Sequence, residues 1–325
     1  MVRELLVLRH GKAKELAEGR GETDACRPLK DRGKRQAQKI GAWMQQQAVL
    51  PTLVLSSPAE RALVSTQKAL KAAGLNAHSI HIDDRLYMAS QRSLLRILAE
   101  YKRHSGTIMI VGHNPGLEGL VHHLVGPSLR DIEGHGVLKT GTLVRLSMPI
   151  SWTELPYGCA RLLNYVFPDT LAMRFPFPDT TGTEYRDRPA YYYTQSAAIP
   201  FRESVNGLEI LVITSSKKKH WVVPKGIHEP GLTAQASAAK EAKEEAGVWG
   251  NVDDVPAGEY VYEKWGAPCH VVVYPMEVTE ITDEKDWDAN YRVRRWVSPA
   301  QAVARLKEEA LKVIVADFAA RHGTA

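Results

Sequence analysis

Cysteine is scarce in this sequence, and its three cysteines lie far apart. Cys26, Cys159 and Cys269 lack the paired spacing of a disulfide framework, a zinc site or a redox motif, so we expect reduced, structural thiols. Long hydrophobic runs are also missing: none approaches the roughly 18 to 20 residues that span a bilayer. Residues 1–7 enter directly into a strand-like segment without a signal-peptide pattern. We therefore expect a cytoplasmic protein without membrane contact.

The composition is that of an ordinary globular chain. Hydrophobic residues make up 44% and charged residues 24%, which argues against disorder, collagen-like repeats and a coiled coil. The length of 325 residues predicts two domains. The net charge of +5 suits a polyanionic ligand. Because many basic proteins bind no nucleic acid, we do not expect a nucleic-acid partner.

The N-terminal part alternates between strands and helices. Short apolar runs predict buried parallel strands at 4–8, 52–55 and 107–111. Helical patterns lie between and after them, at 31–47, 59–73 and 91–104. This alternation predicts an α/β domain with a doubly wound sheet over residues 1–166.

The character of the chain changes at 167–189, where four prolines stand among clustered aspartates and threonines without periodicity. We interpret this segment as an interdomain linker. The following domain, 190–325, is predicted to be an α/β/α sandwich. Its expected strands are 191–200, 208–214, 260–262 and 270–278, and its expected helices are 233–246 and 299–319.

Polar residues follow each predicted strand of the first domain. Arg9 and His10 follow the first strand, Arg61 comes shortly after the second, and His113 and Asn114 follow the third. In an open parallel sheet, ligands bind at the carboxyl ends of the strands. A lone histidine there is more often a satisfied polar residue, and a lone arginine a solvated one. The convergence of the two histidines with Arg9 and Arg61 favours a site.

These residue types suit phosphoryl transfer through a covalent intermediate. An imidazole can act as nucleophile, and arginine forks bind phosphate bidentately and neutralise its charge. Nearby guanidinium groups also favour the neutral, nucleophilic imidazole by lowering its pKa. We expect His10 to attack and His113 to help hold the phosphoryl group.

The motifs around these residues resemble the histidine phosphatase superfamily, SixA branch, over about residues 1–166. They are 8–13, 27–29 with Gly33, 56–58 with Arg61 and Thr66, and 112–115. The resemblance implies a phosphohistidine intermediate at His10, a phosphate pocket of Arg9, Arg61 and His113, and no cofactor. Mutase-like relatives carry a glutamate proton donor where this sequence reads 83–88 without one. That difference favours labile phosphates such as anhydrides or phosphohistidine.

A second acidic cluster lies on the predicted helix that Thr233 caps and Gly247 ends. Glu241, Glu244 and Glu245 stand at i, i+3 and i+4, which places three carboxylates on one face. The alternative is a solvated helix face softened by neighbouring lysines. Oxygen-only clusters suit Mg²⁺, which could activate water against a pyrophosphate.

From Gly226 to Val248 the sequence resembles the Nudix box, with Gly226, Glu241, Glu244 and Glu245 in register. The resemblance implies that these four bind Mg²⁺ or Mn²⁺ and that Glu244 and Glu245 are catalytic. Two positions depart from the pattern, since Leu232 replaces the first glutamate of the box and Lys240 its arginine. In the family these two residues mainly brace the loop against the helix.

Over about 190–320 the chain resembles the branch that hydrolyses diphosphoinositol and diadenosine polyphosphates, on the segments 195–200, 221–226 and 292–298. Such polyanions would bind basic groups, for which Arg202, Lys225 and the run 217–219 are candidates. A surface lysine run is more often a solubilising turn. Asp288 is our candidate for a further acidic ligand or base.

The leading hypothesis is a bifunctional phosphohydrolase that cleaves a phosphoanhydride and removes phosphate through His10. Mycobacterial MutT-type proteins have a similar domain pair in reversed order, which indicates a small polyphosphate such as 8-oxo-dGTP or a diadenosine polyphosphate. The alternative is a protein phosphohistidine phosphatase regulated by a catalytically silent, nucleotide-sensing Nudix domain. A third reading, an RNA-end pyrophosphohydrolase, lacks an aromatic stacking platform in the sequence.

Overall fold

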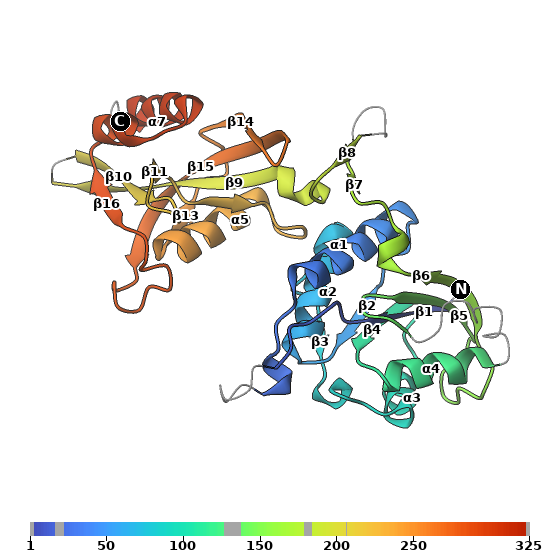
Figure 1. Cartoon of the computed structure of the whole chain (residues 1–325). Helices are drawn as coiled ribbons and strands as arrows, with labels where there is room; N and C mark the ends of the chain where they lie inside the picture. The colour runs from blue at the N-terminus through green and yellow to red at the C-terminus, as the bar shows by residue number, and fades with distance from the viewer. Residues whose placement is uncertain (1–2, 17–22, 127–137, 179–183, 206, 323–325) are drawn as a thin grey trace. The chain divides into compact units, whose positions relative to one another are not determined.

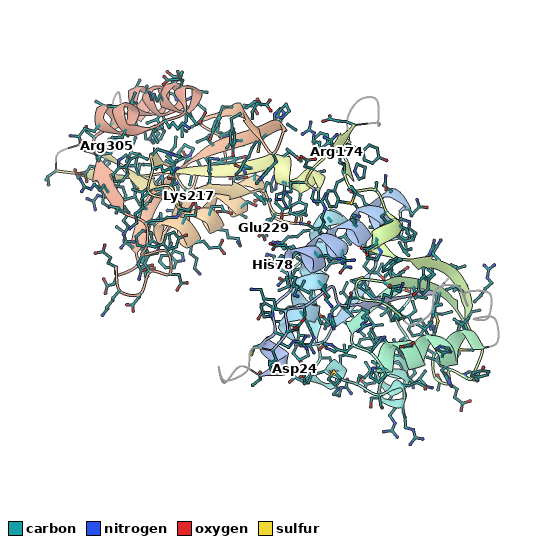
Figure 2. The ribbon with its side chains drawn as sticks, viewed as in Figure 1. Asp24, His78, Arg174, Lys217, Glu229 and Arg305 are labelled. Carbon is teal, nitrogen blue, oxygen red and sulfur yellow. The ribbon has the colours of Figure 1, made fainter. Side chains whose placement is uncertain are left out.

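The chain divides into two compact units, Met1–Pro176 and Phe177–Ala325 (Figure 1). The computed structural model describes residues 3–16, 23–126, 138–178, 184–205 and 207–322, and Figure 2 adds their side chains. The division falls inside the predicted linker 167–189, part of which, 179–183, lies outside the described residues. Among the described helices, none is long and apolar enough to cross a membrane.

The first unit is built on a six-stranded sheet in the order β3-β2-β4-β1-β5-β6. Its strands are β1 (Arg3–Arg9), β2 (Leu53–Ser56), β3 (His81–Ile82), β4 (Thr107–Gly112), β5 (Leu143–Met148) and β6 (Arg161–Val166). Strands β3, β2, β4 and β1 are parallel to one another, β5 pairs antiparallel with β1, and β6 pairs antiparallel with β5. The predicted α/β fold is confirmed, with a sheet of mixed orientation.

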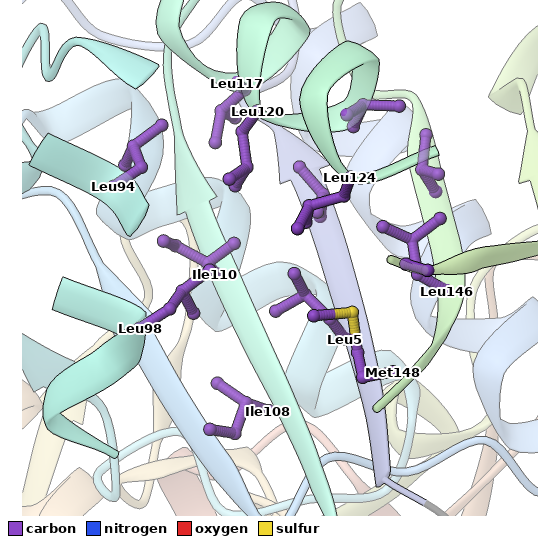
Figure 3. Packing of buried hydrophobic residues seen from close by; sticks show 14 of the residues in the cluster. Leu5, Leu94, Leu98, Ile108, Ile110, Leu117, Leu120, Leu124, Leu146 and Met148 are labelled. Atoms are coloured by element: carbon purple, nitrogen blue, oxygen red, sulfur yellow. The ribbon is translucent and has the colours of Figure 1, made fainter. Parts of the chain in front are cut away.

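Helices cover both faces of this sheet because successive residues of its buried strands point to opposite sides. Leu6 and Leu8 of β1 face α1 (Asp31–Gln46) and α2 (Glu60–Ala72). Leu5 faces α3 (Gln91–Glu100) and α4 (Gly116–Val125), as Figure 3 shows. Helix α3 ends at Glu100, four residues before the predicted end. Short 3-10 helices lie at Asp24–Cys26 (η1), Asp84–Leu86 (η2) and Pro168–Thr170 (η4).

The second unit holds an eight-stranded sheet. The path β11-β10-β9-β15-β13 is extended by β12 on β9, β14 on β15 and β16 on β10. Its strands are β9 (Thr194–Ser204), β10 (Gly207–Thr214), β11 (Trp221–Val222), β12 (Lys225–Ile227), β13 (Val248–Val252), β14 (Gly258–Lys264), β15 (Ala267–Ile281) and β16 (Arg294–Val297). The 3-10 helix η5 (Ala190–Tyr193) precedes β9, so this strand begins after the predicted start. The short strands β7 (Phe175–Pro176) and β8 (Tyr185–Arg186) flank 179–183 in sequence.

Helices lie on both faces of this sheet as well, so the predicted sandwich is confirmed. Helix α5 (Ala234–Glu241) continues into a π-helical turn at Ala242–Ala246 and packs on one face. Helices α6 (Pro299–Arg305) and α7 (Glu309–His322) pack on the other. The single helix predicted over 299–319 is therefore wrong. Leu306 adopts an extended conformation and is buried beside Trp221, which breaks the helix.

Candidate active sites

The first predicted site forms at the carboxyl ends of β1, β2 and β4. Arg9 pairs with Gly112 in the parallel register of β1 and β4, and the His10 amide donates to the Gly112 carbonyl over 3.2 Å. This pairing brings the His10 and His113 rings together, with centroids 5.1 Å apart. The strand order thus juxtaposes side chains that are about a hundred residues apart in sequence.

His10 is held in one tautomer. Its Nδ1 lies 2.7 Å from the Gly11 carbonyl oxygen, which can only accept, so Nδ1 carries the proton. Burial lowers the pKa of His10 to about 4, assisted by the charges of Arg61 and Arg9, and the Gly11 bond opposes this shift. At neutral pH the ring is uncharged and Nε2 has a free lone pair, as a nucleophile requires.

Three polar atoms of this pocket are buried without a hydrogen-bond partner among the described residues: Nε of Arg9, Nδ1 of His113 and Oδ1 of Asn114. The rest of each side chain is anchored. Nη1 of Arg9 and Nδ2 of Asn114 both donate to the Leu138 carbonyl, at 2.7 and 3.0 Å, and Nε2 of His113 lies 2.8 Å from Oγ of Ser57. Unsatisfied buried polar atoms call for a ligand or water. The pocket is therefore preformed for a polar group.

Arg61 is buried, with 3% of its surface exposed, and is fixed by a residue that the motifs did not indicate. Nη2 of Arg61 lies 2.7 Å from Oδ2 of Asp24, the same oxygen that accepts from the Tyr87 hydroxyl at 2.8 Å (Figure 2 labels Asp24). Arg27 donates to the other oxygen at 2.8 Å. The i, i+3 spacing in the sequence indicates a contact between Asp24 and Arg27. The contact between Asp24 and Arg61 spans 37 residues, so the sequence gives no sign of it.

These contacts make Asp24 a positioning carboxylate. The Arg27 hydrogen bond, with those from Tyr87 and Arg61, holds the pKa of Asp24 far below its usual range. The hydrogen bond from the Tyr87 hydroxyl to Asp24 raises the pKa of Tyr87. The Tyr87 ring stands edge-on to the His113 ring, with centroids 5.6 Å apart, in the segment where relatives carry a glutamate donor. Neither group is suited to donate a proton to a leaving group at neutral pH.

The low pKa of His10 predicts an unusual titration. The imidazole should stay neutral until the pH falls to about 4, whereas an exposed histidine charges near pH 6.5. Since the folded pKa lies below the unfolded one, the stability that neutral His10 contributes is present above about pH 6.5 and is lost as pH falls toward 4. NMR titration of the ring resonances, assigned with a His10→Ala variant, measures this. A midpoint near 6.5 would contradict the described burial.

The residues of the second predicted site lie at the end of α5 and in the π-helical turn that follows it. Glu241 has no hydrogen-bond or ion-pair partner among the described residues, and its carboxylate lies against Gly226. A Cβ built on Gly226 would stand 2.1 Å from Oε1 of Glu241, so a larger residue there would require the Glu241 side chain to move. Burial, and then the charge of Glu245, raises the pKa of Glu241 to about 7. This half-buried carboxylate forms no ion pair with the described residues.

Glu245 is fixed on both oxygens. Oε2 accepts from the Lys225 amide at 3.1 Å, and Oε1 accepts from Nη2 of Arg292, a buried arginine. Arg292 lies in the segment 292–298 that carries the family resemblance, but its partner could not be read from the sequence. The two contacts position Glu245 beside the loop that enters α5.

Lys240 has two ion-pair partners, although Lys240 and Leu232 replace the arginine and glutamate that brace the loop in the Nudix family. Its Nζ lies 2.7 Å from Oε2 of Glu244 and 3.5 Å from Oε1 of Glu229 (Figure 2 labels Glu229). The Glu229 amide also donates to Oγ of Ser237 on α5, at 3.2 Å. Glu229, three residues before Leu232, thus connects the loop to the helix through Ser237 and Lys240, as the glutamate that Leu232 replaces would do.

The donor set fits a hard divalent cation, with one rearrangement. Within the described ranges, no three histidine, cysteine, aspartate or glutamate side chains converge closely enough to hold a metal ion as they lie. The Glu241 oxygens, however, have no partner among the described residues and fill the space where a side chain at position 226 would begin, and oxygen ligands suit Mg²⁺ and Mn²⁺. Glu244 would have to leave Lys240 to join it.

Of the predicted phosphate-binding residues, the structure brings only Lys225 to this site. Arg202 forms an ion pair with Glu209 at 2.8 Å. It lies six positions along β9 from Ser196, the residue that pairs with Gly226, which is roughly 20 Å at about 3.3 Å per residue. Asp288 is exposed, without an ion pair or hydrogen bond to the described part of the chain. The run 217–219 is exposed in the turn after β10.

Family comparisons agree with this division into two sites. The model of the histidine phosphatase superfamily (branch 1) matches residues 5–87, and that of the NUDIX domain matches 193–318. Human diphosphoinositol polyphosphate phosphohydrolase 3-alpha is 30% identical over 123 residues, which cover 37% of this chain and 72% of that protein. The chain belongs to both families, as a histidine phosphatase joined to a Nudix domain.

Other similar proteins match one part of the fusion at a time. Mitochondrial Nudix hydrolase 12 of Arabidopsis thaliana is 28% identical over 158 residues, covering 41% of this chain and 77% of that protein. A structure described as a phosphohistidine phosphatase SixA from Agrobacterium tumefaciens is 27% identical and covers 50% of this chain and 96% of that one, with a TM-score of 0.43.

Both families are hydrolases. Histidine phosphatases act on phosphomonoesters or phosphohistidine, and Nudix enzymes act on phosphoanhydrides, generally with a divalent metal such as Mg²⁺.

Proposed function

We propose that the fusion is a bifunctional phosphohydrolase with one independent active site in each domain. The observation that carries the proposal is that each domain holds a reactive group that no described protein group occupies. In the phosphatase domain this group is the free Nε2 of His10 beside three unsatisfied polar atoms. In the Nudix domain it is the unpartnered carboxylate of Glu241 against Gly226.

In the phosphatase domain, Nε2 of His10 would attack phosphorus as the bond to the leaving group breaks, which gives a phosphohistidine. Water would then break the new phosphorus–nitrogen bond and release inorganic phosphate. Arg9, Arg61 and His113 would bind the phosphoryl oxygens during both steps. Asn114 would line the pocket without binding them, because its Nδ2 already donates to Glu118 and Leu138. Because Asp24 and Tyr87 supply no ready acid, substrates with good leaving groups are favoured. A phosphohistidine protein is one such partner.

In the Nudix domain, Glu241, Glu244 and the Gly226 carbonyl, with Glu245, would hold Mg²⁺ or Mn²⁺. When bound, such an ion neutralises a polyphosphate and activates water for attack. The Glu245 oxygens accept from Arg292 and the Lys225 amide, so Glu245 would contribute a remaining lone pair. The Lys225 ammonium would bind a substrate phosphate. We propose a nucleoside or dinucleoside polyphosphate, 8-oxo-dGTP included, or a diphosphoinositol polyphosphate as substrate.

The experiment that tests this function is product identification by mass spectrometry. The full chain is incubated with nucleoside, dinucleoside and diphosphoinositol polyphosphates, and with a phosphohistidine peptide, each with and without Mg²⁺. Mg²⁺-dependent cleavage of an internal phosphoanhydride and Mg²⁺-independent release of phosphate from the peptide are expected. Absence of the first reaction across the panel would remove the Nudix half of the proposal.

The Glu229–Lys240–Glu244 contacts predict opposite effects of two substitutions on metal affinity. Glu229→Gln leaves Lys240 only Glu244 to pair with, so Mn²⁺ binding should weaken about fivefold, as expected from losing about 1 kcal/mol. Lys240→Met frees Glu244, so Mn²⁺ binding should strengthen. Electron paramagnetic resonance of free Mn²⁺ measures both affinities. Equal affinities in the two variants would contradict competition between Lys240 and the metal.

One observation favours a second function for the Nudix domain. Lys240 occupies Glu244, and the three box carboxylates do not converge as they lie. A domain that stayed in this arrangement would bind a nucleotide without cleaving it and would regulate the phosphohistidine phosphatase. Tight nucleotide binding without Mg²⁺-dependent products would support this alternative, and release of pyrophosphate or a nucleoside monophosphate would exclude it.

A further inference from the structure

Two half-buried lysines of the Nudix domain, Lys225 and Lys264, form no ion pair with a carboxylate in the part of the chain that the structure describes. Lys225 donates from Nζ to neutral groups, the Tyr262 hydroxyl at 2.8 Å and Oε1 of Gln195 at 3.1 Å. The contacts of the Lys264 ammonium with the described residues are with aromatic rings, and its Nζ lies 4.2 Å from the centre of the Trp265 ring. Buried charges are normally paired, so two unpaired cations require an explanation.

The two ammonium groups share one aromatic ring. Nζ of Lys225 lies 4.3 Å from the centre of the Tyr262 ring, and Nζ of Lys264 lies 5.9 Å from it. Tyr262 and Lys264 are two positions apart on β14 and therefore point to the same face of the sheet. Tyr262 is held in place by its own hydrogen bond to Gln195, at 2.9 Å. The backbone thus gathers both charges around Tyr262.

Local structure fixes Lys264 at this place. It is the last residue of β14 and pairs with Ala267 across a two-residue turn, Trp265–Gly266, in which both residues have positive φ. Tyr192 stands edge-on to the Trp265 ring at 5.3 Å and supports it beneath Lys264. The lysine is therefore held by a hairpin and an aromatic contact rather than by a counter-ion.

The electrostatic surroundings of Lys264 connect it to the acidic face of the helical segment. Burial lowers the pKa of the Lys264 ammonium group. The carboxylates of Glu245 and Glu241 act on Lys264 from a distance, so this lysine lies within electrostatic range of the metal-binding face. Glu245 itself is already paired with Arg292.

We propose that Lys264 and Lys225 together form an anion subsite that binds a phosphate of the polyphosphate chain next to the metal-binding face. Lys264 is the new member, and no motif of the sequence marks it. An anion between the two ammonium groups would relieve their repulsion and supply the acceptor that Lys264 lacks. The proposal rests on the Nudix function proposed above. It names the residues that bind the phosphate next to the phosphoanhydride bond that is cleaved.

The test is isothermal titration of the full chain with inorganic tripolyphosphate, without divalent metal. Lys264→Met should weaken the tripolyphosphate site of the Nudix domain about tenfold or more, as expected for loss of a charged hydrogen-bonding partner. Lys264→Arg should retain most of the affinity. The matched control is Lys243→Met, because Nζ of Lys243 also lies over a tryptophan ring, 5.3 Å from the centre of Trp249. The His10 pocket is the same in all four proteins, so differences between isotherms report the Nudix domain.

Equal affinities of the parent chain and Lys264→Met would overturn the subsite, and so would an equal loss in Lys243→Met. Mn²⁺ affinity of Lys264→Met should stay at the parental value, since no proposed metal ligand changes. Because the titration needs no turnover, a domain that binds tripolyphosphate through Lys264 but cleaves nothing would refute the Nudix activity while supporting the subsite. The two claims can therefore fail separately.

Discussion

His10→Ala should abolish phosphate release by the phosphatase domain, with a loss on the order of 10³-fold or more, as is usual when a nucleophile is removed. The pocket of Arg9, Arg61 and His113 would still bind phosphate, but no lone pair would remain to accept the phosphoryl group. Release of inorganic phosphate from a phosphohistidine peptide, under single-turnover conditions, measures the effect. Acid-labile, alkali-stable phosphate on the protein should also disappear.

The control for this substitution is His123→Ala in the same domain. His123 lies on α4, and its Nε2 contacts the Leu155 carbonyl at 2.8 Å, so it is a half-buried histidine bound to a backbone oxygen. Phosphate release should stay near the parental rate in this variant. Turnover that survives in His10→Ala, or falls equally in His123→Ala, would show that His10 is not the nucleophile.

Glu241→Gln should reduce Mg²⁺-dependent phosphoanhydride cleavage by about 100-fold or more, since changing even an outer partner of a metal typically costs 10- to 100-fold. The substitution keeps the shape and removes the charge that would face the cation. The variant should also be as stable as the parent or more stable, because it removes a half-buried carboxylate that has no partner among the described residues. Initial rates against Mg²⁺ concentration and thermal unfolding measure the two effects.

Glu309→Gln is the matched control, since Glu309 is an exposed helix residue paired with Lys312 at 2.7 Å. Its rate should equal that of the parent. Retained cleavage in Glu241→Gln would remove Glu241 from the metal site. A lower melting temperature together with lost cleavage would indicate a structural role instead.

The sequence was most informative where regular structure positions the site. Arg9, His10 and His113 follow buried strands, and parallel strands bring their carboxyl ends to one edge, so the convergence could be predicted before the structure was known. Asp24 and Tyr87 come from irregular segments whose paths no local pattern determines. Their contacts with Arg61 depend on tertiary packing and could not be predicted.

The Nudix domain shows the same limit. The cap at Thr233 and the left-handed Gly247, with φ of 64°, begin and end the helical segment as predicted. The π-helical turn and the pairing of Lys240 with Glu229 depend on side-chain contacts across the loop. Lys264 escaped notice because its importance comes from Tyr262 and Lys225, and Lys225 lies 39 residues away in the printed sequence.

The central claim is that one chain carries two independent phosphate-cleaving sites, and a crossed assay tests it most directly. His10→Ala and Glu241→Gln are each assayed on a phosphohistidine peptide and, with Mg²⁺, on a phosphoanhydride that the parent cleaves. Each variant should lose one reaction and keep the other at the parental rate. Loss of both reactions in a single variant, or of neither, would contradict the account.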